Sequence, residues 1–418
     1  MTQLTAGFLA DQFLGIGGKR LELVDTPQGS HQNEIGKAAL FAQFLGDAPR
    51  KGKSGNGFDA KFIWLPDESD QVITHTRSAS WYDSRAGKPG RSPEWRLYYG
   101  RSNPVMQRCQ PGDLLIVALR PDGSLLIIAT PAGSTMFGQL PWLFGLSLEQ
   151  MAEQAQTAEI AQISPDFQAR AILDDLGISM TVSAPEHLQR MIKKFRGTFP
   201  GTARFSEFAR DVAGRTDARA DPDHALLSWF EQEDLLFRAL EQSIVSKRIE
   251  QGFMRDGIAD VDGFLKYSLS VQNRRKSRAG AGFANHVAAV LEANELLFER
   301  EVRTEGRKTI DFFFPRGSLY HDQGFPTRYL TGLGAKTSCK DRWRQVLSEA
   351  HRLEQKYLVT LETKISDHQL EEMSTNGLQL VIPRARHWDF SGSTAERIPV
   401  TVVDFIAETR AKQVPDLL

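Results

Sequence analysis

Asp311, Lys336 and Glu349 are of the residue types that metal-dependent hydrolysis of phosphodiesters requires. Carboxylates hold Mg²⁺, and a lysine orients water or stabilises charge on the scissile phosphate. Asp311 leads a short aromatic run, Lys336 ends an apolar run, and Glu349 follows in a stretch with helical spacing. The combination predicts a hydrolytic metal site. From the residues alone, a structural cluster of ion pairs is the alternative.

Two apolar segments, 309–314 and 329–336, are predicted to be buried strands. If they pair, Asp311 and Lys336 meet at one edge of the sheet. A helix expected over 341–356 carries Glu349 back over that edge. Further strands are expected at 357–361, 378–382 and 398–402, and a last helix at 405–412. Strands that alternate with helices indicate an α/β layer with covered faces.

Residues 1–150 are predicted to form a mainly-β domain. Apolar runs at 62–65, 114–119 and 125–129 are rich in branched residues and bounded by turn signals, and the last two predict a hairpin. A barrel or sandwich is the simplest architecture. Residues 151–205 are expected to be a helical connector. Residues 206–418 form the second large domain, with helices expected at 226–240, 261–270 and 283–298.

The composition is that of a cytosolic globular protein with two or three domains. The chain has 418 residues, 41% of them hydrophobic, and a net charge of −1. Two cysteines, Cys109 and Cys339, argue against a disulfide scaffold. No apolar run approaches the roughly 18 residues of a membrane span, and the first ten residues lack the basic region of a signal peptide. We therefore expect a cytoplasmic protein with no membrane partner.

Two polar arms in the first domain are candidates for contact with DNA. The first arm contains Lys19, Arg20, His31, Gln32 and Asn33, and the second contains Arg85, Lys88, Arg91, Glu94 and Arg96. Cations separated by Gly and Pro suit a loop that lies along a phosphate backbone, and arginine forks can read guanine edges. A solvated surface loop is the competing interpretation.

Asp341 and Arg342 lie where a strand is expected to lead into a helix. A helix N-terminus in the major groove would present both to base edges, because arginine reads guanine and a carboxylate accepts from cytosine N4. Arg344 is a further candidate for base contact, although it cannot share the helix face of Arg342. The alternative is an acid that caps the helix beside a surface arginine.

Several segments resemble the catalytic half of the EcoRII restriction endonuclease family. They are 273–280 (NRRKSRAG), 304–306 (TEG), 311–315 (DFFFP), 320–322 (YHD) and 336–345 (KTSCKDRWRQ), and the resemblance covers about residues 220–385. The first half is similar more loosely, through 29–32 and 85–96. It resembles the effector-binding domain of the family, a pseudobarrel like the plant B-three DNA-binding domain.

The resemblance implies a PD-(D/E)xK nuclease core with Asp311, Lys336 and Glu349 as catalytic residues, Lys340 in support, and Mg²⁺ on the two carboxylates. The acid that normally precedes the lysine by two residues is replaced here by Gly334, and the family supplies a glutamate from the next helix instead. A further acid of the family falls near Ala284 or Asn285, neither of which is acidic. Glu292 is a candidate replacement.

The resemblance also implies how the DNA is read. Asp341 and Arg342 match the pair that reads CC and GG flanks, and Asn273 matches a position on the minor-groove side. Related enzymes extrude the central base pair. Trp229 and Phe230 are our candidates to stack on those bases, with a structural role in the helix as the alternative.

These implications predict a Mg²⁺-dependent type II restriction endonuclease that cleaves both strands of double-stranded DNA at a CCWGG-like site. A homodimer suits a near-palindromic sequence. The first domain would bind a second DNA copy as effector and would autoinhibit the nuclease. A methylation-dependent nuclease and an inactive DNA-binding regulator are the alternatives, and the presence of Asp311, Lys336 and Glu349 argues against the latter.

Overall fold

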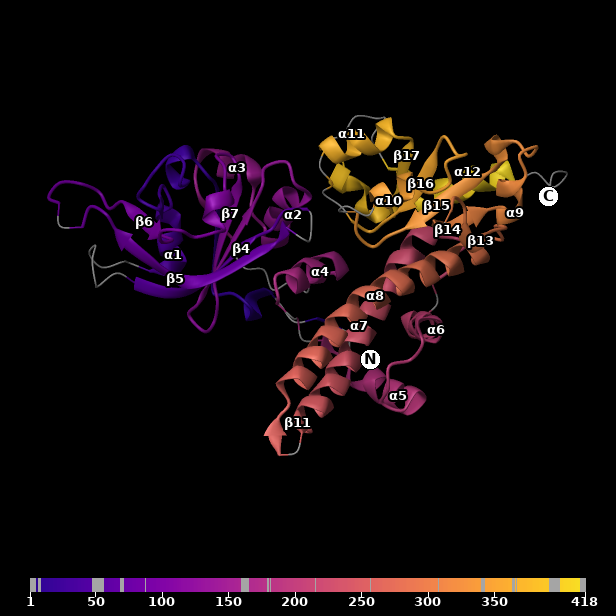
Figure 1. Ribbon diagram of the computed structural model, residues 1–418, viewed down its shortest axis with the longest axis horizontal. Coiled ribbons are helices and arrows are strands. Elements are labelled where there is room, and N and C mark those ends of the chain that lie inside the picture. The colour runs from indigo at the N-terminus through magenta and orange to yellow at the C-terminus, as the bar shows by residue number, and fades with distance from the viewer. Residues whose placement is uncertain are drawn as a thin grey trace.

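The computed structural model describes residues 5–6, 9–46, 56–67, 71–86, 88–158, 165–178, 180, 182–214, 216–255, 257–306, 308–339, 343–362, 365, 367–390 and 399–413. A mainly-β domain lies at one end of the molecule and an α/β domain at the other, with two long helices between them (Figure 1). No helix in these ranges is long and apolar enough to cross a membrane.

The first domain is built on an eight-stranded sheet. Its strands are β2 (Gly15–Arg20), β3 (Glu34–Ile35), β4 (Asn56–Trp64), β5 (Ile73–Asp83), β6 (Trp95–Tyr98), β7 (Leu114–Leu119), β8 (Leu125–Thr130) and β9 (Gln156–Ala158), in the order β3-β6-β5-β4-β8-β7-β2-β9. The expected hairpin is confirmed, because β7 and β8 pair antiparallel. Alternate residues of β7 enter two different apolar clusters, so the sheet is covered on both faces.

One feature of this sheet differs from expectation. Strand β9 pairs with β2, so the sheet continues beyond residue 150. The described residues show no pairing between the outer strands β3 and β9, and the pseudobarrel stays a prediction. Helices α1 (Ala42–Leu45), α2 (Thr135–Phe144) and α3 (Leu148–Glu153) complete the domain.

A helical region joins the two domains. It comprises α4 (Phe167–Asp175), α5 (Pro185–Phe195), α6 (Thr202–Ala213) and the long pair α7 (Pro222–Glu250) and α8 (Val261–Ala293), whose tip carries β11 (Met254–Arg255) and β12 (Ile258–Ala259). A short pair, β1 (Thr5–Ala6) with β10 (Val182–Ser183), lies beside it. The expectation of two helices separated by the basic segment 273–280 is wrong, since α8 is continuous through it.

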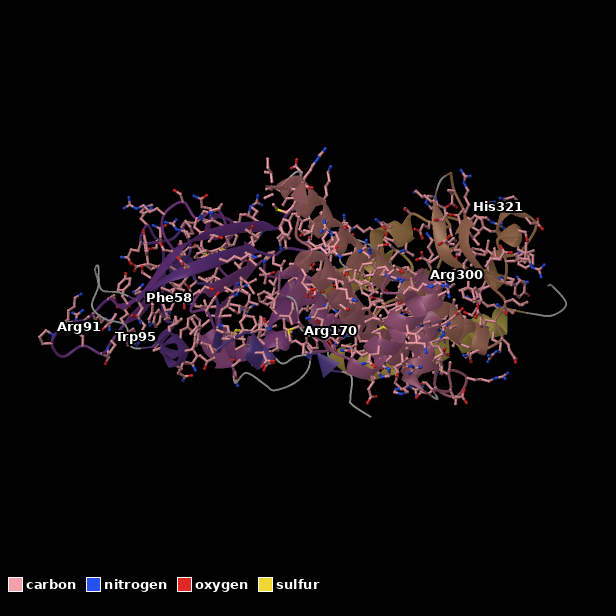
Figure 2. The ribbon with its side chains drawn as sticks, turned by 90° about the horizontal axis from the view of Figure 1, so that it is seen from below. Phe58, Arg91, Trp95, Arg170, Arg300 and His321 are labelled. Atoms are coloured by element: carbon pink, nitrogen blue, oxygen red, sulfur yellow. The ribbon has the colours of Figure 1, made fainter. Side chains whose placement is uncertain are left out.

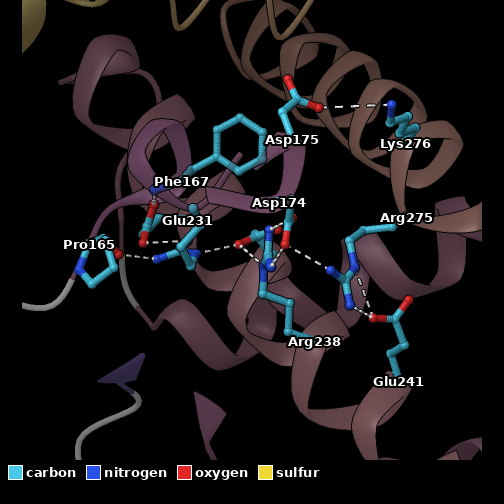
Figure 3. Close-up of polar contacts among 11 residues, drawn as sticks. Pro165, Phe167, Asp174, Asp175, Glu231, Arg238, Glu241, Arg275 and Lys276 are labelled. Carbon is cyan, nitrogen blue, oxygen red and sulfur yellow. Dashed lines mark hydrogen bonds and ion pairs between the residues drawn. The ribbon is translucent and has the colours of Figure 1, made fainter. Parts of the chain in front are cut away.

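The basic segment stays helical because the connector and α7 neutralise its charges (Figure 3). Arg275 forms ion pairs with Asp174 and with Glu241, and Lys276 lies 3.9 Å from Asp175. Gly282 allows α8 to approach α7 closely, because a Cβ there would lie 2.6 Å from a carboxylate oxygen of Glu233.

Helix α4 is anchored to α7 by buried charges in the same network. One carboxylate oxygen of Asp234 accepts from Arg170 Nε at 2.7 Å and from Arg238 Nε at 2.8 Å. Burial opposes ionisation of Asp234, but the two guanidinium groups outweigh it and lower the pKa of that carboxyl. Arg238 continues to Asp174 at 2.7 Å.

The second domain contains a five-stranded sheet in the order β13-β14-β15-β16-β17. Its strands are β13 (Glu299–Arg303), β14 (Thr309–Phe314), β15 (Thr331–Ala335), β16 (Lys356–Val359) and β17 (Leu378–Val381), and its helices are α9 (Gly317–His321), α10 (Trp343–Leu347), α11 (Asp367–Thr375) and α12 (Val402–Lys412). Strands β13 to β15 are antiparallel and β15 to β17 parallel. One face packs on α7, α8 and α12, and α10 and α11 pack on the other.

Two expectations for this domain are corrected. The helix expected over 341–356 ends at Leu347, and Ala350 has a left-handed φ of 47° that is incompatible with a continuing helix. The strand expected at 398–402 is a single bridge between Val400 and Val381. The α/β layer itself is observed.

The buried network predicts a large loss of stability for Asp234→Ala. The substitution leaves two buried guanidinium groups without their shared partner, which should cost about 3–5 kcal/mol in the free energy of unfolding. The exposed pair Arg219–Glu295 supplies the control, because Glu295→Ala should cost less than about 1 kcal/mol. Chemical denaturation of both variants measures the difference, and equal costs would contradict the assignment.

Candidate active site

Strands β14 and β15 bring Asp311 and Lys336 together at one edge, as expected. Phe312 pairs with Leu333, which sets Asp311 beside Gly334. One oxygen of Asp311 accepts from Lys336 Nζ at 2.8 Å and from the Ala335 backbone N–H at 2.7 Å. Both side chains are part-buried. The aspartate is therefore fixed in direction and keeps a second oxygen for another ligand.

Gly334 explains why an acid two residues before the lysine is absent. A Cβ at this position would lie 2.7 Å from one methyl carbon of Val346 and 3.3 Å from the other. Helix α10 therefore packs directly on the strand backbone. No side chain fits at this position unless α10 moves, and the carboxylate must come from elsewhere.

Glu349 supplies that carboxylate from the turn that follows α10. Its Oε2 atom is buried and has no hydrogen-bond partner. Burial, and then the nearby charge of Asp311, raise the pKa of Glu349 to about 7, while Lys336, Lys356 and Lys308 oppose the shift. Two facing carboxylates, one with an unsatisfied buried oxygen, form an environment that a cation would stabilise.

The donor set fits Mg²⁺. In the described part of the chain no group of three or more His, Cys, Asp or Glu side chains is placed to hold a metal. The site therefore offers the two carboxylates of Asp311 and Glu349. Mg²⁺ is commonly bound by one or two carboxylates together with water and substrate phosphate, so two are enough.

Comparison with known proteins identifies the part of the chain that contains this site. Residues 237–406 match the family model described as EcoRII C terminal. Asp311, Lys336 and Glu349 all lie within this matched segment. Over 233 residues the chain is 34% identical to the type II restriction enzyme EcoRII of Escherichia coli, and the match covers 56% of this chain and 56% of that enzyme. The chain thus matches about half the length of this relative.

Two solved structures are also similar to the chain. Metal-depleted Ecl18kI in complex with uncleaved, modified DNA has a TM-score of 0.44 and 17% identity, and the match covers 55% of this chain and 84% of that chain. The PspGI–substrate DNA complex has a TM-score of 0.42 and 15% identity, with 51% and 93% covered.

The other candidate residues of the second domain differ in where they lie and how they are paired. Lys340, Asp341 and Arg342 lie outside the described residues. Arg344 is exposed, forms an ion pair with Glu372 at 3.1 Å and lies over the Trp343 ring. Asn273 is exposed on α8.

Trp229 and Phe230 do not present a free face to a base. They are only 7% and 2% exposed. Trp229 lies beside His286, and Phe230 packs edge-on against Phe167 and Phe283. This burial argues against the predicted stacking role and places both rings in the apolar cluster between α7, α8 and the second sheet.

The position of the family's further acid is occupied by neutral contacts. Asn285 accepts from the guanidinium of Arg300 at 3.2 Å and donates to Ser206 Oγ at 3.1 Å. Ala284 packs against the apolar core, and Glu292 is exposed near the end of α8. Asn285 thus binds an arginine at the position where the resemblance implies an acid.

The first arm of the β domain is partly structural. Lys19 is 3% exposed and binds Asp25 and the Gly36 carbonyl, both at 2.8 Å, so its predicted contact with DNA is wrong for this conformation. Arg20 is half-buried over the Phe137 ring. His31 and Gln32 are exposed, and Asn33, which is half-buried, has a φ of 57°.

The second arm divides into a paired and a free part. Arg85 and Arg96 both bind Glu94, at 2.9 and 2.6 Å. Lys88 and Arg91 are exposed. Arg91 lies at the end of the molecule opposite His321 of the second domain (Figure 2). The exposed part of this arm therefore lies far from the part of the second domain that carries His321.

Glu305 and Lys356, which lie close to Glu349, were not identified from single-residue patterns. The segment 304–306 was noted only through the family resemblance, and Lys356 begins a strand that reads as apolar. Their proximity depends on the turn between α10 and β16.

The contact between Gly334 and Val346 predicts strong coupling in a double-mutant cycle. Gly334→Ala alone should destabilise the protein by about 1–3 kcal/mol, because the new methyl group overlaps Val346. In a Val346→Ala background the same change should cost less than about 0.5 kcal/mol, since the overlap is gone. Urea denaturation of the four proteins measures the coupling. Additive costs would show that the helix does not sit on the strand in this way.

Proposed function

We propose that the protein is a type II restriction endonuclease that hydrolyses both strands of double-stranded DNA with Mg²⁺. The convergence of Asp311, Lys336 and Glu349 within an EcoRII C-terminal domain carries the proposal. The identity of 34% to an enzyme described as a type II restriction enzyme supports it.

Asp311 and Glu349 would hold the cation. Bound Mg²⁺ neutralises charge on the scissile phosphate and activates water. Lys336, whose Nζ lies 2.8 Å from Asp311, directs that carboxylate toward the site. Its own charge would stabilise the negative charge that develops on the phosphate.

The residues proposed to recognise the DNA sequence lie between Lys336 and Glu349 in the chain. Asp341 and Arg342 would read C·G pairs on both sides of a CCWGG-like site, and a homodimer would match its two-fold symmetry. Because α10 both follows this pair and places Glu349, incorrect seating on the DNA would also misplace a metal ligand. Cytoplasmic location fits this role.

The first domain is proposed to bind effector DNA through Lys88, Arg91 and neighbouring residues, and to restrain the nuclease through α2. Gln139 Nε2 donates to Glu362 at 2.9 Å, and Glu362 also accepts the Cys339 backbone N–H. Cys339 lies three residues after Lys336. Gln369 binds both Thr135, at 2.7 Å, and Asp67, at 3.1 Å. The first domain thus contacts Glu362, which in turn binds the loop that leaves the active site.

Plasmid cleavage tests the proposed activity. Purified protein with Mg²⁺ should linearise methylation-free plasmid that carries several CCWGG sites. Lys336→Ala should lower the rate by at least about 100-fold, since it removes charge stabilisation from the transition state. It should still bind DNA without Mg²⁺. An inert wild-type protein, or a variant that cuts at the wild-type rate, would contradict the proposal.

Loosening the domain contact should raise activity on DNA with one site. The double variant Gln139→Ala/Gln369→Ala removes hydrogen bonds between the domains, and each such bond contributes about 1 kcal/mol. We expect about a 10-fold faster cleavage of single-site plasmid. Gln107→Ala, at an exposed position of the first domain, is the control. Unchanged or slower cleavage by the double variant, relative to this control, would exclude restraint through α2.

A further inference from the structure

Glu349 lies in a turn, so the helix alone does not fix its position. Helix α10 ends at Leu347, two residues earlier. Within the turn, the Glu349 backbone N–H donates to the Val346 carbonyl at 3.1 Å, and Ala350 has a left-handed φ. The carboxylate is buried beside Asp311, where like charges oppose its approach. Contacts outside the turn must therefore hold it.

Lys356 holds the side of the turn that precedes Glu349. Its Nζ donates to the Leu347 carbonyl at 2.7 Å, and the residue is 7% exposed. Lys356 is the first residue of β16, and its backbone N–H donates to the Gly377 carbonyl at 2.9 Å. The ammonium group thus joins a helix end to the central sheet. Burial lowers its pKa, while Glu305 and Glu349 oppose that shift.

Glu305 and Thr304 hold the side that follows Glu349. Glu305 Oε1 accepts the His351 backbone N–H at 2.8 Å, and Thr304 Oγ1 accepts the Ala350 N–H at 3.2 Å. Glu305 also accepts a hydrogen bond from the Tyr320 hydroxyl.

Tyr320 connects this contact to the strand of Asp311. Burial, and then Glu305, raise the pKa of Tyr320 to about 12, so its hydroxyl remains a donor at neutral pH. Its ring packs edge-on against Phe313, two residues after Asp311, with centroids 5.3 Å apart. Glu305 and Tyr320 therefore contact both the strand that carries Asp311 and the turn that carries Glu349.

We propose that Lys356 and Glu305 are positioning residues that hold the backbone on both sides of Glu349 and set its carboxylate against Asp311. The inference rests on the proposed function. Glu305 serves as a support because its Oε1 accepts from both the Tyr320 hydroxyl and the His351 backbone N–H. The segments 304–306 and 320–322, which drew attention only by resemblance, thereby acquire a physical role.

The test compares removal of each support with its conservative replacement. Lys356→Met and Glu305→Ala remove the contacts, whereas Lys356→Arg keeps a cationic donor and Glu305→Gln keeps an acceptor oxygen. Lys412→Met and Glu299→Ala are matched controls. Lys412 contacts Tyr357 on the opposite face of β16, and Glu299 accepts the Gly317 N–H at 2.8 Å. Two quantities are measured on the full chain: the Mn²⁺ dissociation constant by titration without DNA, and the single-turnover cleavage rate.

Lys356→Met and Glu305→Ala should each weaken Mn²⁺ binding and slow cleavage by about 10- to 100-fold, as loss of outer supports does in metal sites. Binding of DNA without metal should change by less than about two-fold, because neither residue is proposed to touch DNA. The conservative variants and controls should remain within about three-fold of wild type.

Normal Mn²⁺ affinity in both removal variants would overturn the inference even if the wild type cleaves DNA. Equal loss in Glu305→Gln and Glu305→Ala would instead make the Glu305 charge catalytic and would also overturn it. If the wild type does not cleave, the proposed function fails, and the Mn²⁺ constants still decide the positioning role.

Discussion

The close approach of Val346 to Gly334 is the constraint on which the site depends. A glycine on β15 lets α10 lie on the strand backbone, and the methyl groups of Val346 then fill the space that an acidic side chain would need. The second carboxylate has to come from the turn after the helix. That turn has no regular backbone hydrogen bonding of its own like that of a strand. Lys356, Thr304 and Glu305 fix its backbone through hydrogen bonds on both sides of Glu349. The absence of a side chain at Gly334 thus accounts for the contacts that Lys356, Thr304 and Glu305 make with the turn around Glu349.

The arrangement is electrostatically unfavourable until a cation binds. Glu349 is buried beside Asp311, and its pKa rises to about 7. Folding elsewhere must offset that repulsion, and the apolar clusters around the second sheet and the buried charges that join α4 to α7 are available to do so. The same framework extends to the first domain, where Gln139 contacts Glu362 beside the loop after Lys336. A chain of hydrogen bonds through Glu362 therefore links α2 of the first domain to Cys339 in the loop after Lys336.

Periodicity and residue type were enough to predict β7, β8, β14 and the α/β layer, because those segments are short, apolar and buried on both faces. They were not enough for α8, whose basic segment is helical and has Arg275 paired with Asp174 and Glu241, which are distant in sequence. Lys19 was misjudged for a similar reason, since Asp25 captures it. Trp229 looks like a stacking group in sequence, but its burial depends on packing that no local pattern reveals. The pairing of Asp311 with Lys336 was predictable from strand order. The supports of Glu349 were not, because they depend on where a five-residue helix ends.

Anomalous X-ray diffraction from crystals of the full chain grown with Mn²⁺ tests the central claim most directly. We predict one strong anomalous peak per chain in contact with carboxylate oxygens of both Asp311 and Glu349, at the roughly 2.0–2.2 Å typical of small divalent cations. Lys336 should remain beside Asp311 in that state. A peak bound by Asp311 without Glu349, or a Glu349 carboxylate turned away from the metal, would contradict the claim that the turn after α10 supplies the second ligand.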